Sequence, residues 1–336
     1  MNYRSIGRSG LDVSEIGFGA WGIGGDAYGP IDARTAVETV KAAVDSGVNF
    51  FDTSDVYGEG RSEEVLGNAL GTKRDGIVIS SKGGMLPHRG FRMPQDFGRA
   101  HLEAAVHASL RRLRTDHIDL YQLHSPTLAE LESGEAIEAL GRFKAQGWVG
   151  LIGVSARSPG DAQTMIERFD LDFIQVNFNL IDQRAATCGL LETARSRGIG
   201  VIARTPLCFG YLTGRLTGKE LWGSLDHRSN WPGSQLERWA GSPGLFEHLY
   251  STSTSTHASP RLSATATPCT AAQFALRFCL TNPGVSTVIP GMMNPEQVRE
   301  NAAAADLGRL DASTLAEVES IYRAHEFYDR TIKAAA

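Results

Sequence analysis

Four side chains that can donate or accept protons lie at or just after the ends of three successive apolar runs. Asp52 ends the first run and Tyr57 comes five residues later, Lys82 ends the second run, and His124 ends the third. A phenol is a poor acid at neutral pH, but a neighbouring ammonium favours its anion and lowers its pKa. We therefore expect Lys82 to activate Tyr57, with Asp52 keeping Lys82 charged and oriented. His124 would hydrogen-bond a substrate oxygen or help to relay a proton, so the set predicts proton transfer to a carbonyl oxygen.

None of these residues can supply a hydride, so a reaction that reduces a carbonyl needs a cofactor as its reductant. The chain has four cysteines, which form no CxxC pair and have no histidine at metal-ligand spacing. We therefore predict no metal site. Cys279 lies in the apolar stretch QFALRFCL, which is typical of a small core residue.

The elements that must position these side chains alternate regularly along the chain. Short β-branched runs are each followed by a stretch with 3.6-residue periodicity. The predicted strands are 14–20, 49–54, 76–82, 117–124, 149–155, 172–178, 199–204 and 286–291, and the predicted helices are 32–46, 62–70, 97–113, 130–146, 159–168, 185–197, 270–281 and 294–305. This alternation predicts an α/β fold, a single (β/α)8 TIM barrel, with an open doubly wound sheet as the alternative. The carboxyl ends of barrel strands form one rim, where active sites lie, so the four residues would meet there.

The chain is longer than a barrel requires. Its 336 residues would allow two domains, but the strand pattern predicts one barrel domain over residues 1–336. A barrel takes about 250 residues. We assign the excess to an N-terminal hairpin around Gly7–Gly10 at the base of the barrel, a long loop at 206–268 after the seventh strand, and a C-terminal helix near 311–324.

The long loop shows no helical or strand periodicity. Its segments GYLTGR and WPGSQLERW are predicted to fold over the site, whereas the Ser/Thr tract at 251–256 is predicted to be flexible and 251–268 partly disordered. Trp222, Trp231 and Trp239 would form either the packed interior of a lid or a wall of the substrate pocket.

Charge and hydropathy exclude several classes of partner. The 33 basic and 38 acidic residues give a net charge of −5, which argues against nucleic-acid binding and against a polybasic membrane surface. No apolar run approaches the 18 residues of a membrane span, and the amino-terminal segment lacks the apolar stretch of a signal peptide. We therefore expect a cytoplasmic protein with a small-molecule substrate. The sequence does not predict an oligomeric state.

With these motifs in place, the chain resembles the aldo-keto reductase family. The resemblance runs through VSEIGFGAWGIGG, GVNFFDTSDVYGEGRSEEVLG, ISSKGG, LRRLRTDHIDLYQLHSP, GLIGVS, FIQVNFNL and STVIPGMMNPEQVRENAAA. It implies that Asp52, Tyr57, Lys82 and His124 are the catalytic tetrad and that Tyr57 is the general acid. It also implies an extended NADPH as cofactor, with NADH as the alternative.

The resemblance further implies cofactor contacts near the nicotinamide. Ser155 and Gln175 match residues that bind the carboxamide, although the asparagine that often follows that serine is replaced by alanine. Arg204, Pro206 and Leu207 stand at the end of the seventh strand, where relatives usually offer an aromatic face. The Arg204 guanidinium would stack on a ring, bind an acidic substrate group or pair with a loop carboxylate.

The segment after the last strand resembles the one that holds the adenosine end of the cofactor, and the matching residues are Gly291, Gln297 and Asn301. Many relatives have Lys or Arg for the 2′-phosphate near the position of Met292–Met293. That charge-assisted contact is missing here, unless Arg299 replaces it from the helix. NADPH is the family's usual cofactor, and this departure leaves NADH open.

These features together predict the reduction of an aldehyde or ketone. Trp21 and Tyr28, which flank the glycine-rich stretch 22–29, would form walls of the substrate pocket. The polar loop and Arg204 suggest a hydrophilic substrate such as a sugar or a nucleotide-linked keto-sugar. An NAD(P)-dependent sugar or alcohol dehydrogenase that works in the oxidative direction is an alternative. A second alternative is a non-catalytic nucleotide-sensing subunit, like the potassium-channel β subunits. The intact tetrad disfavours this alternative.

Overall fold

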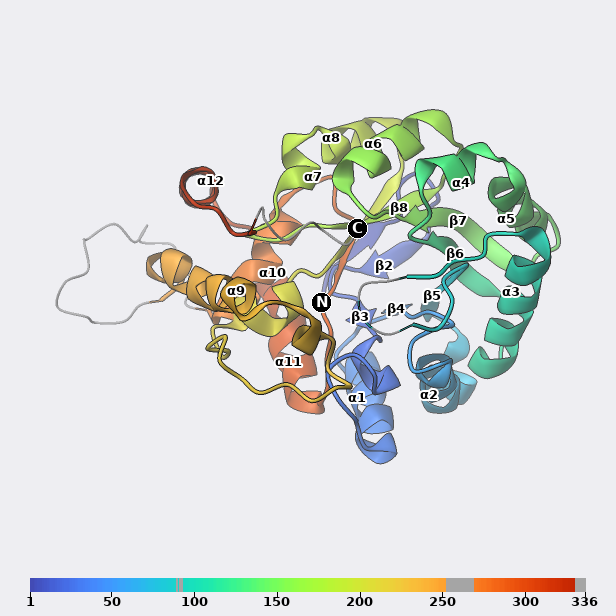
Figure 1. The fold of residues 1–336 in the computed structure, drawn as a ribbon, viewed down its shortest axis with the longest axis horizontal. Helices are drawn as coiled ribbons and strands as arrows, with labels where there is room; N and C mark the ends of the chain where they lie inside the picture. Colours follow the sequence, from blue (N-terminus) through green and yellow to red (C-terminus); the bar gives the residue numbers. More distant parts are fainter. Residues whose placement is uncertain (89, 91–92, 252–268, 330–336) are drawn as a thin grey trace.

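A parallel barrel is the centre of the structure. The computed structural model describes residues 1–88, 90, 93–251 and 269–329. Strands β3 to β10 lie side by side in chain order, and each pairs with the next in parallel. Single bridges from Ile16 to Val288 and from Gly19 to Gly291 bring the first strand against the last, so the barrel is nearly closed (Figure 1). The predicted TIM barrel is confirmed, and the doubly wound sheet is excluded.

All eight predicted barrel strands are found. They are β3 (Phe18–Gly19), β4 (Phe50–Asp52), β5 (Val78–Gly83), β6 (Ile118–His124), β7 (Val149–Ser155), β8 (Phe173–Asn177), β9 (Gly200–Arg204) and β10 (Thr287–Ile289). The predicted N-terminal hairpin is also present, as β1 (Tyr3–Ser5) and β2 (Asp12–Ser14), which pair in antiparallel fashion.

Helices follow the strands on the outside of the barrel (Figure 1). They are α1 (Ala33–Asp45), α2 (Arg61–Leu70), α3 (Arg99–Leu113), α4 (Leu128–Glu132), α5 (Glu135–Ala145), α6 (Pro159–Arg168), α7 (Arg184–Thr187), α8 (Leu190–Arg197), α9 (Gly233–Phe246), α10 (Ala271–Thr281), α11 (Pro295–Ala303) and α12 (Ala312–Ala324). Two helices expected to be continuous are each split, at Gly134 between α4 and α5 and at Gly189 between α7 and α8. The predicted C-terminal helix is α12.

Side-chain caps fix several helix starts. The Thr127 hydroxyl accepts a bond from the backbone N–H of Glu130, whose carboxylate in turn accepts from the Thr127 backbone, so α4 begins with a capping box. The Asn294 side chain accepts from the backbone N–H of Gln297, and Pro295 occupies the first turn of α11.

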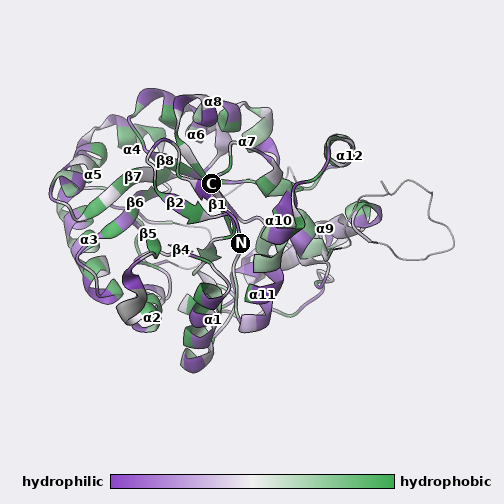
Figure 2. Ribbon diagram, turned by 180° about the vertical axis from the view of Figure 1, so that it is seen from behind, coloured by the Kyte–Doolittle hydropathy of each residue, from purple (hydrophilic) through white to green (hydrophobic). Residues whose placement is uncertain are grey.

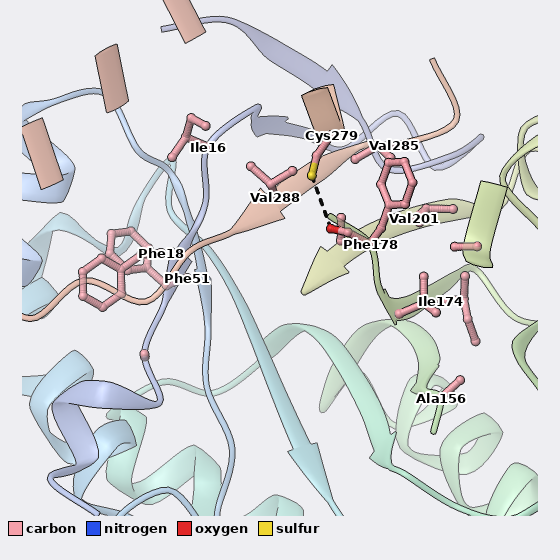
Figure 3. Packing of buried hydrophobic residues seen from close by; sticks show 14 of the residues in the cluster. Ile16, Phe18, Phe51, Ala156, Ile174, Phe178, Val201, Cys279, Val285 and Val288 are labelled. Atoms are coloured by element: carbon pink, nitrogen blue, oxygen red, sulfur yellow. Dashed lines mark hydrogen bonds between the residues drawn. The ribbon is translucent and has the colours of Figure 1, made fainter. Parts of the chain in front are cut away.

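The apolar core has two parts, in agreement with the layers of a barrel. The larger part lies between the strands and the helices, where Phe18 and Phe51 pack with ring centroids 5.6 Å apart and Cys279 donates its thiol to the Phe178 carbonyl (Figure 3). Figure 2 shows hydrophobic residues on the strands and on the helix faces toward them, with hydrophilic residues on the outer helix faces. The smaller part fills the barrel interior and includes Ile6 and Val13 of the hairpin. The hairpin therefore closes the base of the barrel, as predicted, and Cys279 is the core residue that its sequence context indicated.

The segment after β9 is more ordered than its sequence indicated. Between residues 206 and 250 it contains the 3-10 helices η3 (Cys208–Thr213), η4 (His227–Asn230) and η5 (Glu247–Leu249), and the fourteen-residue helix α9. The prediction of a loop without regular structure was therefore wrong for this part. Because α9 contains Pro243 and three glycines, its sequence has weak helix propensity, and burial of Trp239 and Phe246 stabilises the helix instead. Residues 252–268, with most of the Ser/Thr tract, lie outside the described residues, so their predicted flexibility stays a prediction.

Candidate active site

The barrel interior has an apolar layer and a polar layer, and the alternation of strand side chains produces both. Phe50, Val78, Leu120, Phe173 and Ile202 belong to the interior apolar cluster. Because side chains alternate along a strand, residues two positions further on face the same interior, nearer the carboxyl rim. Those residues are Asp52, Ser80, Gln122, Gln175 and Arg204. The sequence thus builds a hydrophobic floor with a hydrogen-bonding layer directly above it.

Asp52 and Lys82 form a buried ion pair in this polar layer. Lys82 Nζ donates to Asp52 Oδ1 at 2.5 Å and to the backbone carbonyl of Thr53 at 2.6 Å. The exposed fractions of the two side chains are 0% for Lys82 and 4% for Asp52. Burial by itself favours a neutral amine, but the attraction of Asp52 and Tyr57 outweighs it and raises the pKa of Lys82. The predicted role of Asp52, to keep Lys82 charged, agrees with this geometry.

Two amides hold the second oxygen of Asp52. Gln175 Nε2 donates to Asp52 Oδ2 at 2.8 Å, and Gln122 Nε2 donates to the same oxygen at 3.1 Å. Ser155 Oγ donates to the other end of the Gln175 amide at 3.1 Å. The two predicted carboxamide-binding residues are therefore adjacent to each other and joined to Asp52. Gln122 was not predicted as a site residue, although it lies two residues before His124 and therefore faces the same side of β6.

Tyr57 lies over the ion pair on the loop between β4 and α2. Lys82 Nζ is 4.9 Å from the centroid of the Tyr57 ring, and the ring of His124 meets that ring edge-on with centroids 5.7 Å apart. A Cβ atom at Gly24 would lie 2.9 Å from backbone atoms of Tyr57 and Gly58, so the glycine-rich loop packs directly on this segment. The structure thus brings all four tetrad residues together.

The net effect on the Tyr57 phenol differs from the one expected. Burial raises the pKa of Tyr57, and the Lys82 ammonium lowers it by less, so that it lies above its ordinary value of 10.0. The expected direction of the Lys82 effect is correct, but the sequence could not reveal the desolvation that exceeds it. Tyr57 consequently stays protonated at neutral pH and holds the proton that a general acid must donate.

His124 is neutral in this environment. Burial, followed by the positive charges of Lys82 and Arg204, keeps the pKa of His124 well below its ordinary value of 6.5. Its Nδ1 lies 3.0 Å from Ser54 Oγ. Gln95 Nε2 donates to the backbone carbonyl of His124 at 2.9 Å, which holds the end of β6. A neutral imidazole presents one donor and one acceptor, so its other nitrogen can bind a substrate oxygen.

The residues that follow two site positions have strained backbones. Ser125, directly after His124, has φ of 62°, and Thr205, directly after Arg204, has φ of 52°. Such angles are unusual for any residue with a Cβ and most costly for a β-branched one. Asn179 Nδ2 donates to the Thr205 carbonyl at 2.9 Å, and Thr205 Oγ1 donates to Asn177 Oδ1 at 2.9 Å. The β9 rim is therefore held in an unfavourable conformation by hydrogen bonds with Asn177 at the end of β8 and with Asn179 just after it.

Arg204 reaches the rim, and no carboxylate of the described residues pairs with it there. One guanidinium nitrogen donates to the backbone carbonyl of Ala156 at 3.0 Å, and Nε is buried with no hydrogen-bond partner among the described residues. No ion pair of Arg204 occurs in the part of the chain that the structure describes, so the loop salt bridge considered from the sequence is not formed there. Pro206 and Leu207 follow it and are both buried. A partly desolvated cation therefore remains beside the tetrad.

The predicted adenosine end lies at β10 and α11. The backbone N–H of Met293 donates to Gln297 Oε1 at 2.7 Å, and Asn301 is buried, with 3% of its surface exposed. Met292 is fully buried, whereas a Cβ on Gly22 would lie 2.4 Å from Met293 Sδ. Gly291 bridges to β3 beside the ring of Tyr28. Arg299 is exposed on α11.

An aromatic wall covers the rim beside Tyr57. The ring centroid of Trp21 is 6.0 Å from that of Tyr57, 5.7 Å from that of Tyr28 and 4.6 Å from that of His227. His227 comes from the segment after β9, and its backbone N–H donates to the Ala27 carbonyl at 2.8 Å. This segment therefore lies against the glycine-rich loop. Of the three loop tryptophans, Trp239 is fully buried, which agrees with the packed-lid alternative for that residue.

Two candidate site types find no support in the described part of the chain. No group of three or more His, Cys, Asp or Glu side chains is arranged to hold a metal ion among the residues that the structure describes. Within the same ranges, no helix is both long enough and apolar enough to cross a membrane.

The fold and the tetrad define a barrel oxidoreductase, and comparison with known proteins agrees. Residues 15–323 match the model of the aldo/keto reductase family. The chain is 32% identical to aldo-keto reductase YhdN of Bacillus subtilis, over 89% of this chain and 87% of that protein. It is 30% identical to L-galactose dehydrogenase of Arabidopsis thaliana, over 95% of this chain and 93% of that one. The solved structure of glycerol dehydrogenase AKR11B4 from Gluconobacter oxydans superposes with a TM-score of 0.77 at 29% identity and covers 99% of both chains. The chain belongs to the aldo/keto reductase family, whose members are NAD(P)H-dependent oxidoreductases that act on small carbonyl substrates.

Proposed function

We propose that this protein reduces an aldehyde or ketone to the alcohol, with Tyr57 as the general acid. The observation that carries the proposal is the buried Lys82–Asp52 pair, which places an ammonium 4.9 Å from the centroid of the Tyr57 ring. A phenol protonated at neutral pH can give its proton to the developing alkoxide, and the ammonium stabilises the phenolate that results. His124 is the second group that binds the substrate oxygen and orients it toward Tyr57.

The rim also fits a nicotinamide cofactor, which supplies the hydride for the carbonyl carbon when bound. Ser155 and Gln175 are hydrogen-bonded to each other beside Asp52 and offer polar atoms to a carboxamide. Arg204 has a buried Nε that lacks a partner among the described residues, which suits stacking on or bonding to a ligand. Gly291, Gln297 and Asn301 line the segment proposed for the adenosine end, together with Pro206 and Leu207 from the segment after β9.

We infer weak discrimination between NADPH and NADH. Met292 is buried and Met293 packs on Gly22, so neither position offers a cation to a 2′-phosphate. Arg299 is exposed on α11 and is the nearest alternative along the sequence. A charge-assisted bond to phosphate contributes about 1.5–3 kcal/mol, so a site without one should bind the two cofactors with similar affinity.

The substrate class that suits this rim is small, polar and hydroxylated. Burial lowers the pKa of His227 to about 4, so its imidazole is neutral, and its Nε2 has no hydrogen-bond partner among the described residues. Trp21 and Tyr28 beside it would pack on the apolar face of a sugar ring, and Arg204 would receive an anionic group. The similarity to L-galactose dehydrogenase and to glycerol dehydrogenase supports polyols or sugars as substrates. It also favours a second candidate function, the oxidation of such an alcohol through the same residues.

A substrate panel tests the proposal. NADPH and NADH oxidation would be followed with nitrobenzaldehyde, small ketones, aldoses and nucleotide-linked keto-sugars, and reduction of NADP and NAD with the corresponding alcohols. We expect turnover of the reactive aldehyde and the highest kcat/KM with a hydroxylated carbonyl compound. Cofactor binding without turnover of any carbonyl or alcohol would contradict the proposal and support a nucleotide-sensing subunit.

A further inference from the structure

A single buried hydroxyl connects His124 to a second acidic residue. Ser54 Oγ lies 3.0 Å from His124 Nδ1 and 3.1 Å from Asp55 Oδ1. Ser54 is fully buried and His124 is 8% exposed, so water competes little for these contacts. Nothing in the tetrad itself requires this connection, because Asp55 contacts neither Lys82 Nζ nor Tyr57 in the hydrogen bonds of the described residues.

The hydroxyl has one hydrogen, and this fixes the direction of both contacts together. If Asp55 is ionised it can only accept, so Ser54 donates to Asp55 and its oxygen accepts from His124 Nδ1–H. A neutral imidazole protonated at Nδ1 has an unprotonated Nε2. In this state His124 offers the substrate an acceptor, which suits the O–H of an alcohol.

If Asp55 is protonated, both hydrogen bonds can point in the opposite direction. Asp55 then donates to Ser54 Oγ, and Ser54 donates to His124 Nδ1, which leaves the imidazole proton on Nε2. His124 now offers the substrate a donor, which suits a carbonyl oxygen. The two states differ by one proton. Starting from ionised Asp55, a proton binds to His124 Nε2, and His124 passes its Nδ1 proton to Ser54 Oγ. Ser54 then passes its own hydroxyl proton to Asp55. No other bond changes, and His124 is neutral in both states.

Charged groups around the hydrogen-bonded chain Asp55–Ser54–His124 bring the titration of Asp55 close to neutral pH. Asp55 faces Glu63 of α2, Arg112 of α3 and the phenol of Tyr121 on β6. Burial, followed by the negative charge of Glu63, raises the pKa of Asp55 to about 7.

The imidazole end of the chain faces a different set of charges. Lys82, Arg204 and His88 face His124 and disfavour its cationic form. The proton taken up near neutral pH is therefore held by the carboxyl group rather than by the imidazole.

We propose that Asp55, acting through Ser54, is a positioning residue that selects the tautomer of His124 and so adapts the site to a carbonyl or to an alcohol. The inference rests on the proposed oxidoreductase function and adds a group to it. In this arrangement, reduction is favoured on the acid side of the Asp55 titration and oxidation on the alkaline side.

The direct test is the tautomer of His124 in the wild-type protein. Nitrogen NMR of protein labelled with ¹⁵N-histidine distinguishes a protonated from an unprotonated ring nitrogen, and the His124 signals are assigned with His124→Asn. We expect the proton to move from Nδ1 to Nε2 as pH falls through about 7. In Asp55→Asn, whose amide can only donate to Ser54 or accept from it without titrating, the tautomer should not change with pH. A wild-type tautomer that is the same at pH 5 and pH 9 would overturn the proposal, whatever the activity.

The kinetic test compares pH profiles in both directions with the wild-type enzyme, Asp55→Asn, Ser54→Ala and Ser54→Thr. In the wild type, kcat/KM for reduction should fall about tenfold per pH unit above the midpoint, as for one titrating group. Asp55→Asn and Ser54→Ala should lose this step, whereas Ser54→Thr, which keeps the hydroxyl, should retain it. Glu64→Gln, which removes an exposed carboxylate from α2, is the control and should retain it too.

The outcomes separate this inference from the proposed function. A uniform loss of rate in Asp55→Asn and Ser54→Ala, with the pH step unchanged, would assign these residues a structural role and overturn the inference. Turnover of no substrate by the wild type would contradict the proposed function, while the NMR test of the tautomer would still be decisive for the hydrogen-bond chain.

Discussion

Lys82 Nζ lies 2.5 Å from Asp52 Oδ1, and the two side chains are almost completely buried. The attraction of Asp52 raises the pKa of Lys82 and keeps its ammonium charged in a place where a single charge would be costly. The same ammonium lies against the ring of Tyr57, so one ion pair serves both the stability of the barrel interior and the acid that acts on the substrate.

The ion pair predicts a large effect of Asp52→Asn on stability. The change leaves the Lys82 charge buried without its partner, and breaking such a pair costs about 3–5 kcal/mol. Urea unfolding would measure the free energy of unfolding. Glu192→Gln is the control, because it breaks the solvent-exposed pair with Arg195, which water screens, so its effect should be much smaller. Equal effects of the two substitutions would show that the buried pair is not required for folding.

The methionines after β10 predict an effect of Met293→Arg on cofactor choice. The new guanidinium should bind the 2′-phosphate and tighten NADPH binding about tenfold to a hundredfold, in line with about 1.5–3 kcal/mol for a charge-assisted bond. NADH binding should stay unchanged, and Met293→Leu should affect neither. Fluorescence titration of the wild type and the two variants with each cofactor gives the dissociation constants. If the wild type already binds NADPH a hundredfold more tightly than NADH, another cation holds the phosphate.

Arg204 at the end of β9 has a buried Nε without a hydrogen-bond partner among the described residues. We therefore expect the effect of Arg204→Gln on KM to depend on the charge of the substrate. KM for a substrate with a carboxylate or phosphate should rise about tenfold or more, because the charge-assisted contact is lost. KM for a neutral aldehyde should change less than about twofold on the same argument. Steady-state kinetics with a matched pair of substrates checks this. The same rise with both would indicate that Arg204 holds the cofactor or the rim rather than the substrate.

The raised pKa of Asp55 predicts a pH-dependent effect of Asp55→Asn on stability. The folded state holds the Asp55 proton up to a pH of about 7, whereas the unfolded chain releases it near 3.8. The stabilisation from this group is complete at low pH and is lost as pH rises between these values. Asparagine does not titrate, so Asp55→Asn should become more stable relative to the wild type as pH rises from 4 to 8. Urea midpoints across this range measure the difference, and a constant difference would mean that Asp55 titrates normally.

Much of the fold was predictable because each strand is followed by a helix with clear periodicity. All eight strands and the hairpin were expected from short β-branched runs and glycine positions. The helix α9 was not, because its proline and its three glycines lower the helix propensity of a segment that the packing of Trp239 and Phe246 stabilises. Local propensity is a weak guide when tertiary burial decides.

The site was predictable in its members but not in its electrostatics. Asp52 and His124 end their strands and Lys82 is next to the end of β5, and residues at that rim must converge in a closed barrel. The net pKa of Tyr57 depends on its burial, which no spacing reveals. The contact from Asp55 to His124 depends on which way the Ser54 side chain turns, and the sequence DTSDVY does not determine this.

The most direct test of the account is Tyr57→Phe, assayed with nitrobenzaldehyde and NADPH. The substitution removes the acidic proton and leaves the ring that packs beside Lys82, so kcat should fall by about a factor of 10²–10⁴. The dissociation constant for NADPH should remain within about twofold of the wild-type value, because Tyr57 is assigned no part in cofactor binding. Undiminished turnover would contradict the assignment of Tyr57 as the general acid.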